Sequence, residues 1–262
     1  MLESPKILGI LNVTRDSFSD GGAYLDPDAA IVRADELATG GADAIDVGAA
    51  ASNPDAESVS SELEVARLGP VVSHLQARGV RVSIDSFSTE TQRWALGRSV
   101  DFLNDIQGFS DPSFYPELAD ARCKLIVMHS VQASGAATRV ASDVDTIRDR
   151  ILDFFETRLR SLRDAGVSDS RLILDPGMGF FLGNRPEVSM TVLQWLPDLR
   201  KHFDLPVLIS VSRKSFLGAL TGAPVQDRGA ARAMTELYAA KQGADYIRTH
   251  DPQALTGALS AG

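Results

Sequence analysis

Eight short apolar runs recur along the chain, and nearly every one ends in a polar or charged residue. In sequence letters they are KILGILN, DAIDVG, RVSIDS, DFLNDI, KLIVMH, RLILDP, PVLISVS and DYIRTH. Between them lie segments with helical spacing of apolar residues, at 27–39, 60–78, 90–98, 144–165 and 187–203. Strands that alternate with helices form parallel sheets through right-handed crossovers. Eight such units in 262 residues predict an α/β fold, the closed (β/α)8 TIM barrel, with an open doubly wound sheet as the alternative.

The polar residues at the ends of these runs favour the barrel. They are Asn12, Asp46, Asp85, Asn104, Asp105, His129, Asp175, Ser212, Lys214, Arg248 and His250. Barrel enzymes build their sites at the carboxyl ends of the strands. Asp and Asn after a strand often cap helices or shape turns, which suits Asp111 and Asp143. That interpretation fails for Lys214, Arg248 and His250, whose side chains lack a capping oxygen.

Composition and charge exclude several classes of protein. A net charge of −9 would repel a nucleic-acid backbone. No apolar stretch approaches a membrane span and no signal peptide is recognisable, so we expect a cytoplasmic protein without membrane partners. The lone Cys123 lies beside an apolar run and is interpreted as core packing. No linker or repeat divides the chain, which predicts one domain over residues 1–262.

Three connections are long enough to serve as lids, at 13–27, 48–60 and 130–143. The chain ends about a dozen residues after Arg248, so the last helix is expected to be short. On the outer helices, apolar residues around Trp195 and Tyr238 hint at a partner surface.

Three strand-end motifs carry candidate chemistry. The Asp-Pro-Gly-Met-Gly turn at 175–179 has glycines that permit positive φ and close approach of a ligand. SVSRKSF at 210–216 places two cations after a buried strand, and Lys214 there requires an anion or a carboxylate nearby. In IRTHD, Arg248 and His250 occupy alternate positions and point to the same side, which suits a leaving phosphate group.

Together with ILNVTRDSFSDGG at 10–22, these motifs closely resemble dihydropteroate synthase, the folate-pathway enzyme that sulfonamides inhibit. The resemblance includes SIDS, LNDI and VMH around Asp85, Asn104 and Met128, and it spans nearly the whole chain. It implies a barrel enzyme, usually a homodimer, that condenses dihydropterin-6-ylmethyl diphosphate with 4-aminobenzoate. It also implies release of pyrophosphate with the help of Mg²⁺.

The resemblance assigns roles to individual residues. Pterin binding is implied for Asp85, Asn104, Ile106, Met128, Asp175, Lys214 and Arg248. Binding of 4-aminobenzoate is implied for Ser52, Pro54, Phe180, Phe181 and Ser215. Diphosphate binding is implied for Asn12, Arg248 and His250, with Asn12 as the Mg²⁺ ligand. The implied catalytic residues are Asp16, Lys214, Arg248 and His250. Two structural alternatives remain: Asp85 and Asp175 as salt-bridge partners of Lys214, and Asn12 as a turn residue.

Two loops depart from the usual family pattern. At 48–54 the chain reads Gly-Ala-Ala-Ala-Ser-Asn-Pro, so Asn53 replaces an arginine that usually helps to bind pyrophosphate. Phe181, Leu182 and Gly183 follow Phe180 where the family usually has Gly-Lys. Both departures match the divergent sulfonamide-insensitive synthases of mobile resistance elements and their chromosomal relatives. We therefore expect Phe180 or Phe181 to narrow the pocket against the bulkier drug, with packing at the barrel mouth as the alternative.

Two other functions stay open at this point. A corrinoid-linked methyltransferase shares the D-P-G-type pocket, but it gives no reason for the SRK motif and the diphosphate residues together. A non-catalytic pterin-binding paralogue is conceivable because the loop arginine is missing, and it would bind the pterin diphosphate without turnover.

Overall fold

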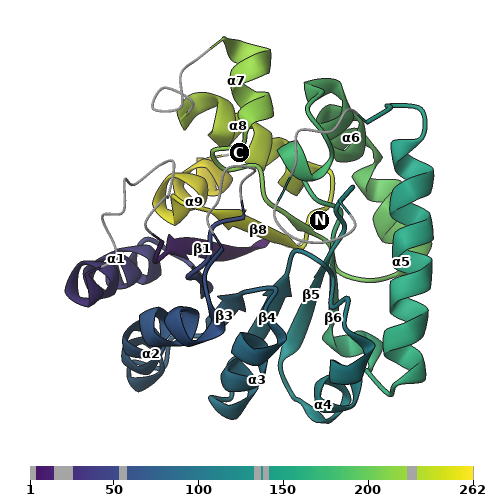
Figure 1. Cartoon of the computed structure of the whole chain (residues 1–262). Coiled ribbons are helices and arrows are strands. Elements are labelled where there is room, and N and C mark those ends of the chain that lie inside the picture. Colours follow the sequence, from purple (N-terminus) through teal and green to yellow (C-terminus); the bar gives the residue numbers. More distant parts are fainter. Residues whose placement is uncertain are drawn as a thin grey trace.

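The computed structural model describes residues 4–14, 26–52, 58–132, 137, 142–222 and 229–261, with only the backbone given for Ser215, Leu220 and Thr221. Its parallel strands are β1 (Lys6–Asn12), β2 (Ala44–Gly48), β3 (Val82–Asp85), β4 (Phe102–Asp105), β5 (Lys124–Met128), β6 (Leu172–Asp175), β7 (Leu208–Ile209) and β8 (Tyr246–Thr249). They lie in the order β6-β5-β4-β3-β2-β1-β8-β7. A parallel bridge from Leu174 to Val207 joins the two ends. The predicted (β/α)8 barrel is confirmed (Figure 1).

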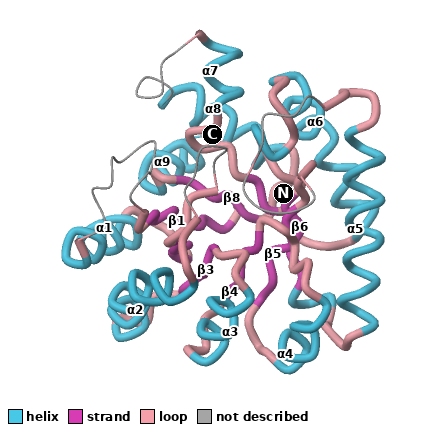
Figure 2. Tube along the Cα trace, in the orientation of Figure 1, coloured by secondary structure: helices cyan, strands magenta, loops and turns pink. Residues whose placement is uncertain are grey.

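Helices surround the strands (Figure 2). The α-helices are α1 (Pro27–Thr39), α2 (Ser61–Ala77), α3 (Thr89–Gly97), α4 (Tyr115–Asp120), α5 (Ile147–Asp164), α6 (Pro186–Phe203), α7 (Ser215–Thr221), α8 (Gly229–Lys241) and α9 (Pro252–Ala261). Short 3₁₀ turns span Pro112–Phe114, Asp169–Arg171 and Gly179–Phe181. The five helices expected from apolar spacing are all present, and their ends differ from the predicted ends by at most three residues. None of the helices that the structure describes has the length and apolarity of a membrane span.

Local capping sets several helix starts. The Ser60 hydroxyl accepts the Leu63 N–H at 3.3 Å, and the Ser88 hydroxyl accepts the Thr91 N–H at 3.3 Å. These contacts satisfy backbone donors that have no partner within the first turn of a helix. Asp111 likewise caps a 3₁₀ turn by accepting the Ser113 N–H at 2.9 Å, as its position predicted.

The barrel interior is layered, because alternate residues of a strand point to the same side. The interior layer nearer the amino ends of the strands is an apolar cluster of Leu8, Ala44, Phe102, Ile126, Ile173, Leu208 and Tyr246. Two positions further along the strands stand Ile10, Asp46, Asn104, Met128, Asp175, Ser210 and Arg248. The interior therefore changes from an apolar layer to a mostly polar layer toward the carboxyl ends of the strands.

A second apolar core fills the space between the strands and the helices, and it includes Trp195 and Cys123. Burial raises the pKa of the Cys123 thiol, which agrees with its predicted role in packing. The expectation of apolar exposure around Trp195 was wrong, because Trp195 is only 8% exposed and packs inward from α6. Tyr238 is half-buried against the same core, and the exposed apolar residue of α8 is Met234.

Candidate active site

Arg248 lies at the centre of the polar layer, held by two carboxylates. Its Nε donates to Asp46 Oδ2 at 2.5 Å, and its Nη2 donates to Asp85 Oδ2 at 2.5 Å. Asn104 Nδ2 donates to the same Asp46 oxygen at 3.2 Å. Strands β2, β3, β4 and β8 thus bring these four side chains together. Burial lowers the pKa of Arg248, but Asp46 and Asp85 together raise it above its usual range, so the guanidinium stays charged.

From the sequence we identified Asp46 as a polar residue at the end of an apolar run, but we did not assign it a role in binding or catalysis. The structure makes it the central acceptor of the site, with no exposed surface. Its position two residues after the interior Ala44 is the signal that places it in the barrel.

Lys214 and Asp175 stand on neighbouring parts of the same site. Burial, with Arg248 as the next cause, lowers the pKa of Lys214 to about 8. Burial raises the pKa of Asp175 to about 6, although Lys214 and the Gly177 N–H at 2.8 Å oppose the rise. The alternative of a salt bridge from Lys214 to Asp85 or Asp175 is not formed within the described residues, although both carboxylates act to raise the Lys214 pKa. Asp85 pairs with Arg248 instead, and Lys214 Nζ lies 4.8 Å from the centre of the Phe181 ring.

Two of the strand-end residues point away from the site. Asp105 accepts from Gln92 Nε2 at 2.9 Å and from the Phe109 N–H at 3.1 Å, so it orders the loop after β4. His129 faces α5, where its ring meets the edge of Phe154, and its Nδ1 lies 3.0 Å from the Pro176 oxygen. Each directly follows an interior residue of its strand, so alternation explains their orientation.

The Asp-Pro-Gly-Met-Gly turn has the conformation that its glycines predicted. Gly177 has φ +79°, and a Cβ there would lie 2.5 Å from the His129 oxygen. Gly179 has φ +64°, and a Cβ there would meet the aliphatic part of Lys214 at 3.4 Å. The turn therefore allows Lys214 to pass close to the backbone.

Phe181 is buried in a small apolar cluster with Ile106, Met128 and Ala137, and Phe87 and Phe180 pack against it. Phe180 is half-buried, and its backbone oxygen accepts from Gln132 Nε2 at 3.1 Å. The predicted pterin residues Ile106 and Met128 therefore belong to the same cluster as the aromatic pair predicted for 4-aminobenzoate. The Ala137 N–H donates to the Ser52 oxygen at 2.9 Å, which places Ser52 beside this cluster.

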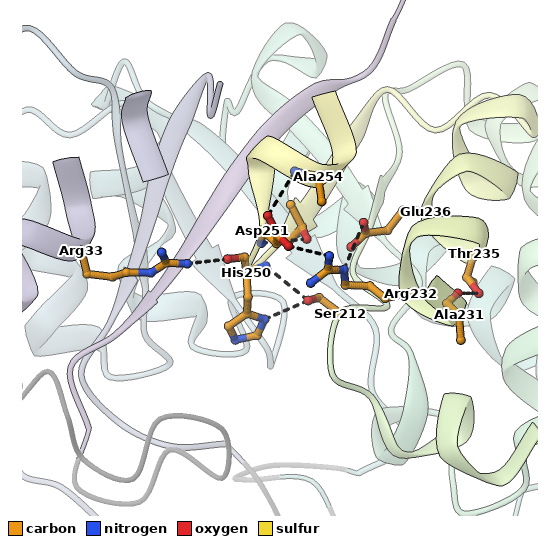
Figure 3. Close-up of polar contacts among 10 residues, drawn as sticks. Arg33, Ser212, Ala231, Arg232, Thr235, Glu236, His250, Asp251 and Ala254 are labelled. Carbon is orange, nitrogen blue, oxygen red and sulfur yellow. Dashed lines mark hydrogen bonds and ion pairs between the residues drawn. The ribbon is translucent and has the colours of Figure 1, made fainter. Parts of the chain in front are cut away.

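His250 is fixed beyond the end of β8. Ser212 Oγ lies 2.9 Å from His250 Nδ1, and Arg33 Nη2 donates to the His250 oxygen at 2.7 Å (Figure 3). Burial, with Arg213 as the next cause, lowers the pKa of His250 well below its usual value. Asn12 is half-buried at the end of β1, and its side chain makes no hydrogen bond to the described part of the chain.

Several predicted residues lie outside the described residues, namely Asp16, Asn53 and Pro54, and so does the side chain of Ser215. Parts of the three predicted lid connections also lie outside the described residues, at 15–25, 53–57, 133–136 and 138–141.

Glu236 on α8 has no exposed surface and lies beside Arg232 (Figure 3). Among the described residues its ion-pair partner is Arg232, with Nε 3.7 Å from Oε2, and Arg232 Nη2 also pairs with Asp251 at 2.7 Å. Burial raises the pKa of Glu236 to about 7, although Arg232 opposes the rise. The carboxyl group is therefore held in its neutral form well above the pH at which it ionises in the unfolded chain.

We expect Glu236→Gln to remove a pH dependence of stability. Between pH 4.5 and 7 the unfolded chain loses this proton and the folded chain keeps it, so the free energy of unfolding falls as pH rises. The stability gained by the variant should therefore grow through this window, reach on the order of 3 kcal/mol or less, and stay constant above pH 7. Urea unfolding at several pH values from 4.5 to 8 measures the difference.

Glu187→Gln is the matched control, because Glu187 is 61% exposed and should give no pH-dependent difference. A difference between wild type and Glu236→Gln that does not change from pH 4.5 to 8 would contradict the prediction.

Known proteins resemble this chain throughout its length. The model of the pterin binding enzyme family matches residues 8–250. A dihydropteroate synthase type-2 from Escherichia coli is 55% identical over 260 residues, covering 99% of this chain and 96% of the relative. A type-1 enzyme from Escherichia coli is 52% identical over 255 residues, covering 97% and 91%. The solved structure of Xanthomonas albilineans dihydropteroate synthase with 4-aminobenzoic acid has a TM-score of 0.89 at 33% identity, covering 99% and 92%. The chain therefore belongs to the pterin binding enzyme family, within the group of dihydropteroate synthases that includes types 1 and 2.

Proposed function

We propose that the polar layer binds the pterin diphosphate, that the cluster around Phe181 borders the 4-aminobenzoate, and that the chain condenses them into dihydropteroate and pyrophosphate. The proposal rests on Arg248, whose side chain is 13% exposed and is fixed by two carboxylates at the catalytic face of a barrel. We also propose a cytoplasmic homodimer, as the family resemblance implies.

Buried acceptors without partners support pterin recognition. Among the described residues, Asp46 Oδ1 and Asn104 Oδ1 are buried and have no hydrogen-bond partner. Such groups are costly unless a ligand or water satisfies them. The amino-pyrimidinone edge of a pterin offers several N–H groups. The two unpaired oxygens and Asp175 would accept hydrogen bonds from them. Lys214 would donate to the ring carbonyl or to N5.

Release of pyrophosphate requires stabilisation of negative charge. Arg248 and His250 supply donors on the same side of β8, and a planar guanidinium suits both a ring and a phosphate. We propose that the carbon–oxygen bond breaks first and that the aminobenzoate nitrogen then attacks the pterin methylene cation. The protein would favour charge separation through placed donors and carboxylates, with no side-chain nucleophile.

The donor set fits Mg²⁺ only as a metal shared with the substrate. The described residues contain no cluster of three His, Cys, Asp or Glu side chains that could hold a metal alone. Mg²⁺ typically takes one or two protein oxygens and completes its shell with substrate phosphates and water. Asn12 would supply such an oxygen. When bound, the metal would neutralise charge on the leaving pyrophosphate.

The experiment for this proposal is pyrophosphate release by the purified chain with the pterin diphosphate, 4-aminobenzoate and Mg²⁺. Release should require all three components. Tight binding of the pterin diphosphate without release would favour the non-catalytic paralogue.

The drug response is a separate prediction, and the structure favours Phe181 over Phe180 as its cause. Phe181 is 6% exposed and lies within the same apolar cluster as Ile106 and Met128, two of the predicted pterin residues. We propose that the wild type is sulfonamide-insensitive and that Phe181→Leu lowers the Ki of sulfamethoxazole by about tenfold or more, because a smaller side chain admits the bulkier drug. Inhibition of pyrophosphate release across a drug titration measures the effect.

Phe180→Leu is the matched control and should change the Ki less than Phe181→Leu does. The KM for 4-aminobenzoate should stay within a few-fold in both variants. A wild type already inhibited at low drug concentration, or an unchanged Ki in Phe181→Leu, would contradict this assignment.

A further inference from the structure

Ser212 makes two hydrogen bonds to the same histidine. Its Oγ accepts the backbone N–H of His250 at 3.2 Å and lies 2.9 Å from His250 Nδ1 (Figure 3). Ser212 is only 3% exposed, so water does not readily replace these partners. A short segment after β7 and the residue that follows β8 are thus joined through one hydroxyl group.

The hydrogen-bond inventory of a hydroxyl favours one direction for the second bond, because an Oγ that accepted from both N–H groups would leave its own O–H without an acceptor. Ser212 has one O–H to donate, and its Oγ already accepts the His250 N–H. Within the described residues, the only acceptor in reach of that O–H is His250 Nδ1. The ring nitrogen that accepts carries no proton, so the single proton of a neutral His250 belongs on Nε2.

The surroundings of His250 favour the neutral ring. Burial is the main cause that lowers its pKa, and the cations that face it, Arg213, Arg248, Lys214 and Arg232, lower it further. A neutral imidazole donates from one nitrogen only, so its tautomer decides whether it offers a proton or a lone pair to a bound phosphate.

We propose that Ser212 is a positioning residue that keeps the His250 proton on Nε2, so that this N–H donates to the diphosphate of the substrate and to the departing pyrophosphate. Nε2 makes no hydrogen bond to the part of the chain that the structure describes, so it is available as this donor. Arg33 holds the backbone of the same residue through its oxygen at 2.7 Å. The role toward diphosphate rests on the proposed function, whereas the tautomer does not.

The tautomer is tested directly by long-range ¹H–¹⁵N spectra of the ¹⁵N-histidine-labelled chain at pH 7.5 without ligands. The chain has four histidines, so His250→Asn suffices to assign the signals of His250. The wild type should show a protonated Nε2 and an unprotonated Nδ1. Ser212→Ala should shift the ring toward a mixture of tautomers, and Ser212→Thr should keep the wild-type pattern. A proton on Nδ1 of the wild-type ring would overturn the proposal.

Kinetics separate this role from general support of the fold. Ser212→Ala should raise the KM for the pterin diphosphate about tenfold and leave the KM for 4-aminobenzoate within twofold, and Ser212→Thr should restore the first value. Ser161→Ala, on the surface of α5, should change neither. An unchanged KM for the pterin diphosphate in Ser212→Ala would overturn the positioning role. Absence of turnover in the wild type would instead reject the proposed function, and the spectra would still decide the tautomer.

Discussion

Replacing Arg248 with lysine should lower kcat/KM for pyrophosphate release by about a hundredfold to a thousandfold. The guanidinium uses two nitrogens, Nε on Asp46 and Nη2 on Asp85, each at 2.5 Å. A single ammonium group lacks this fork, so one buried carboxylate would lose its partner and the cation would shift from its place in the site. Steady-state kinetics with both substrates measure the loss.

Arg200→Lys is the matched control for that variant. Arg200 also donates through Nε and Nη2, here to the two oxygens of Asp245, but its side chain is 48% exposed. An exposed pair of this kind contributes about 1 kcal/mol or less, so the control should keep full activity. An Arg248→Lys enzyme with kcat/KM within threefold of wild type would contradict the role given to Arg248.

Lys214→Met should abolish most activity without destabilising the fold. Burial lowers the Lys214 pKa to about 8, so the charged form that prevails at pH 7 is held against a desolvation cost. A methionine of similar length removes that cost and keeps the packing against Phe181. We expect kcat/KM to fall by about a hundredfold or more and the free energy of unfolding at pH 7 to stay equal or rise.

Lys214 should also make the stability of the wild type depend on pH. Because the folded pKa of Lys214 lies below the unfolded value, the wild type gains stability as pH rises from about 8 to 10.5, and Lys214→Met should lack that gain. Kinetics and urea unfolding are measured on the same preparations. Lys201→Met on the exposed face of α6 is the control and should change neither. A loss of activity accompanied by a comparable loss of stability would show that Lys214 supports the fold instead.

The strands and most helices follow from local sequence. Runs such as DAIDVG and DYIRTH mark strands because buried parallel strands are continuous apolar segments. Helical spacing predicted the ends of α1 and α6 to within one residue. Alternation also predicted Arg248 and His250 on one side of the strand, but β8 ends at Thr249 and His250 lies just beyond it.

The pairing of charges could not be predicted in the same way. The sequence offers four carboxylates at or near strand ends, Asp46, Asp85, Asp105 and Asp175, and which of them meets Arg248 depends on barrel closure and strand register. Asp46 lies on β2 and Arg248 on β8, and the two residues come together because both strands pair with β1, which lies between them. Lys214 was expected near an anion or a carboxylate, and Asp175 and Asp85 do raise its pKa. Its contact with the Phe181 ring was not predicted, because it depends on how the turn at Gly179 passes Lys214.

Mass spectrometry of the reaction product decides whether this barrel mouth makes dihydropteroate. Purified chain is incubated with the pterin diphosphate, 4-aminobenzoate and Mg²⁺, beside Arg248→Lys and Arg200→Lys. We predict dihydropteroate formation that equals pyrophosphate release in the wild type and in Arg200→Lys and that nearly disappears in Arg248→Lys. If the folded wild-type chain makes no dihydropteroate, the barrel mouth does not catalyse this condensation, and if all three proteins make equal amounts, Arg248 does not take part in it.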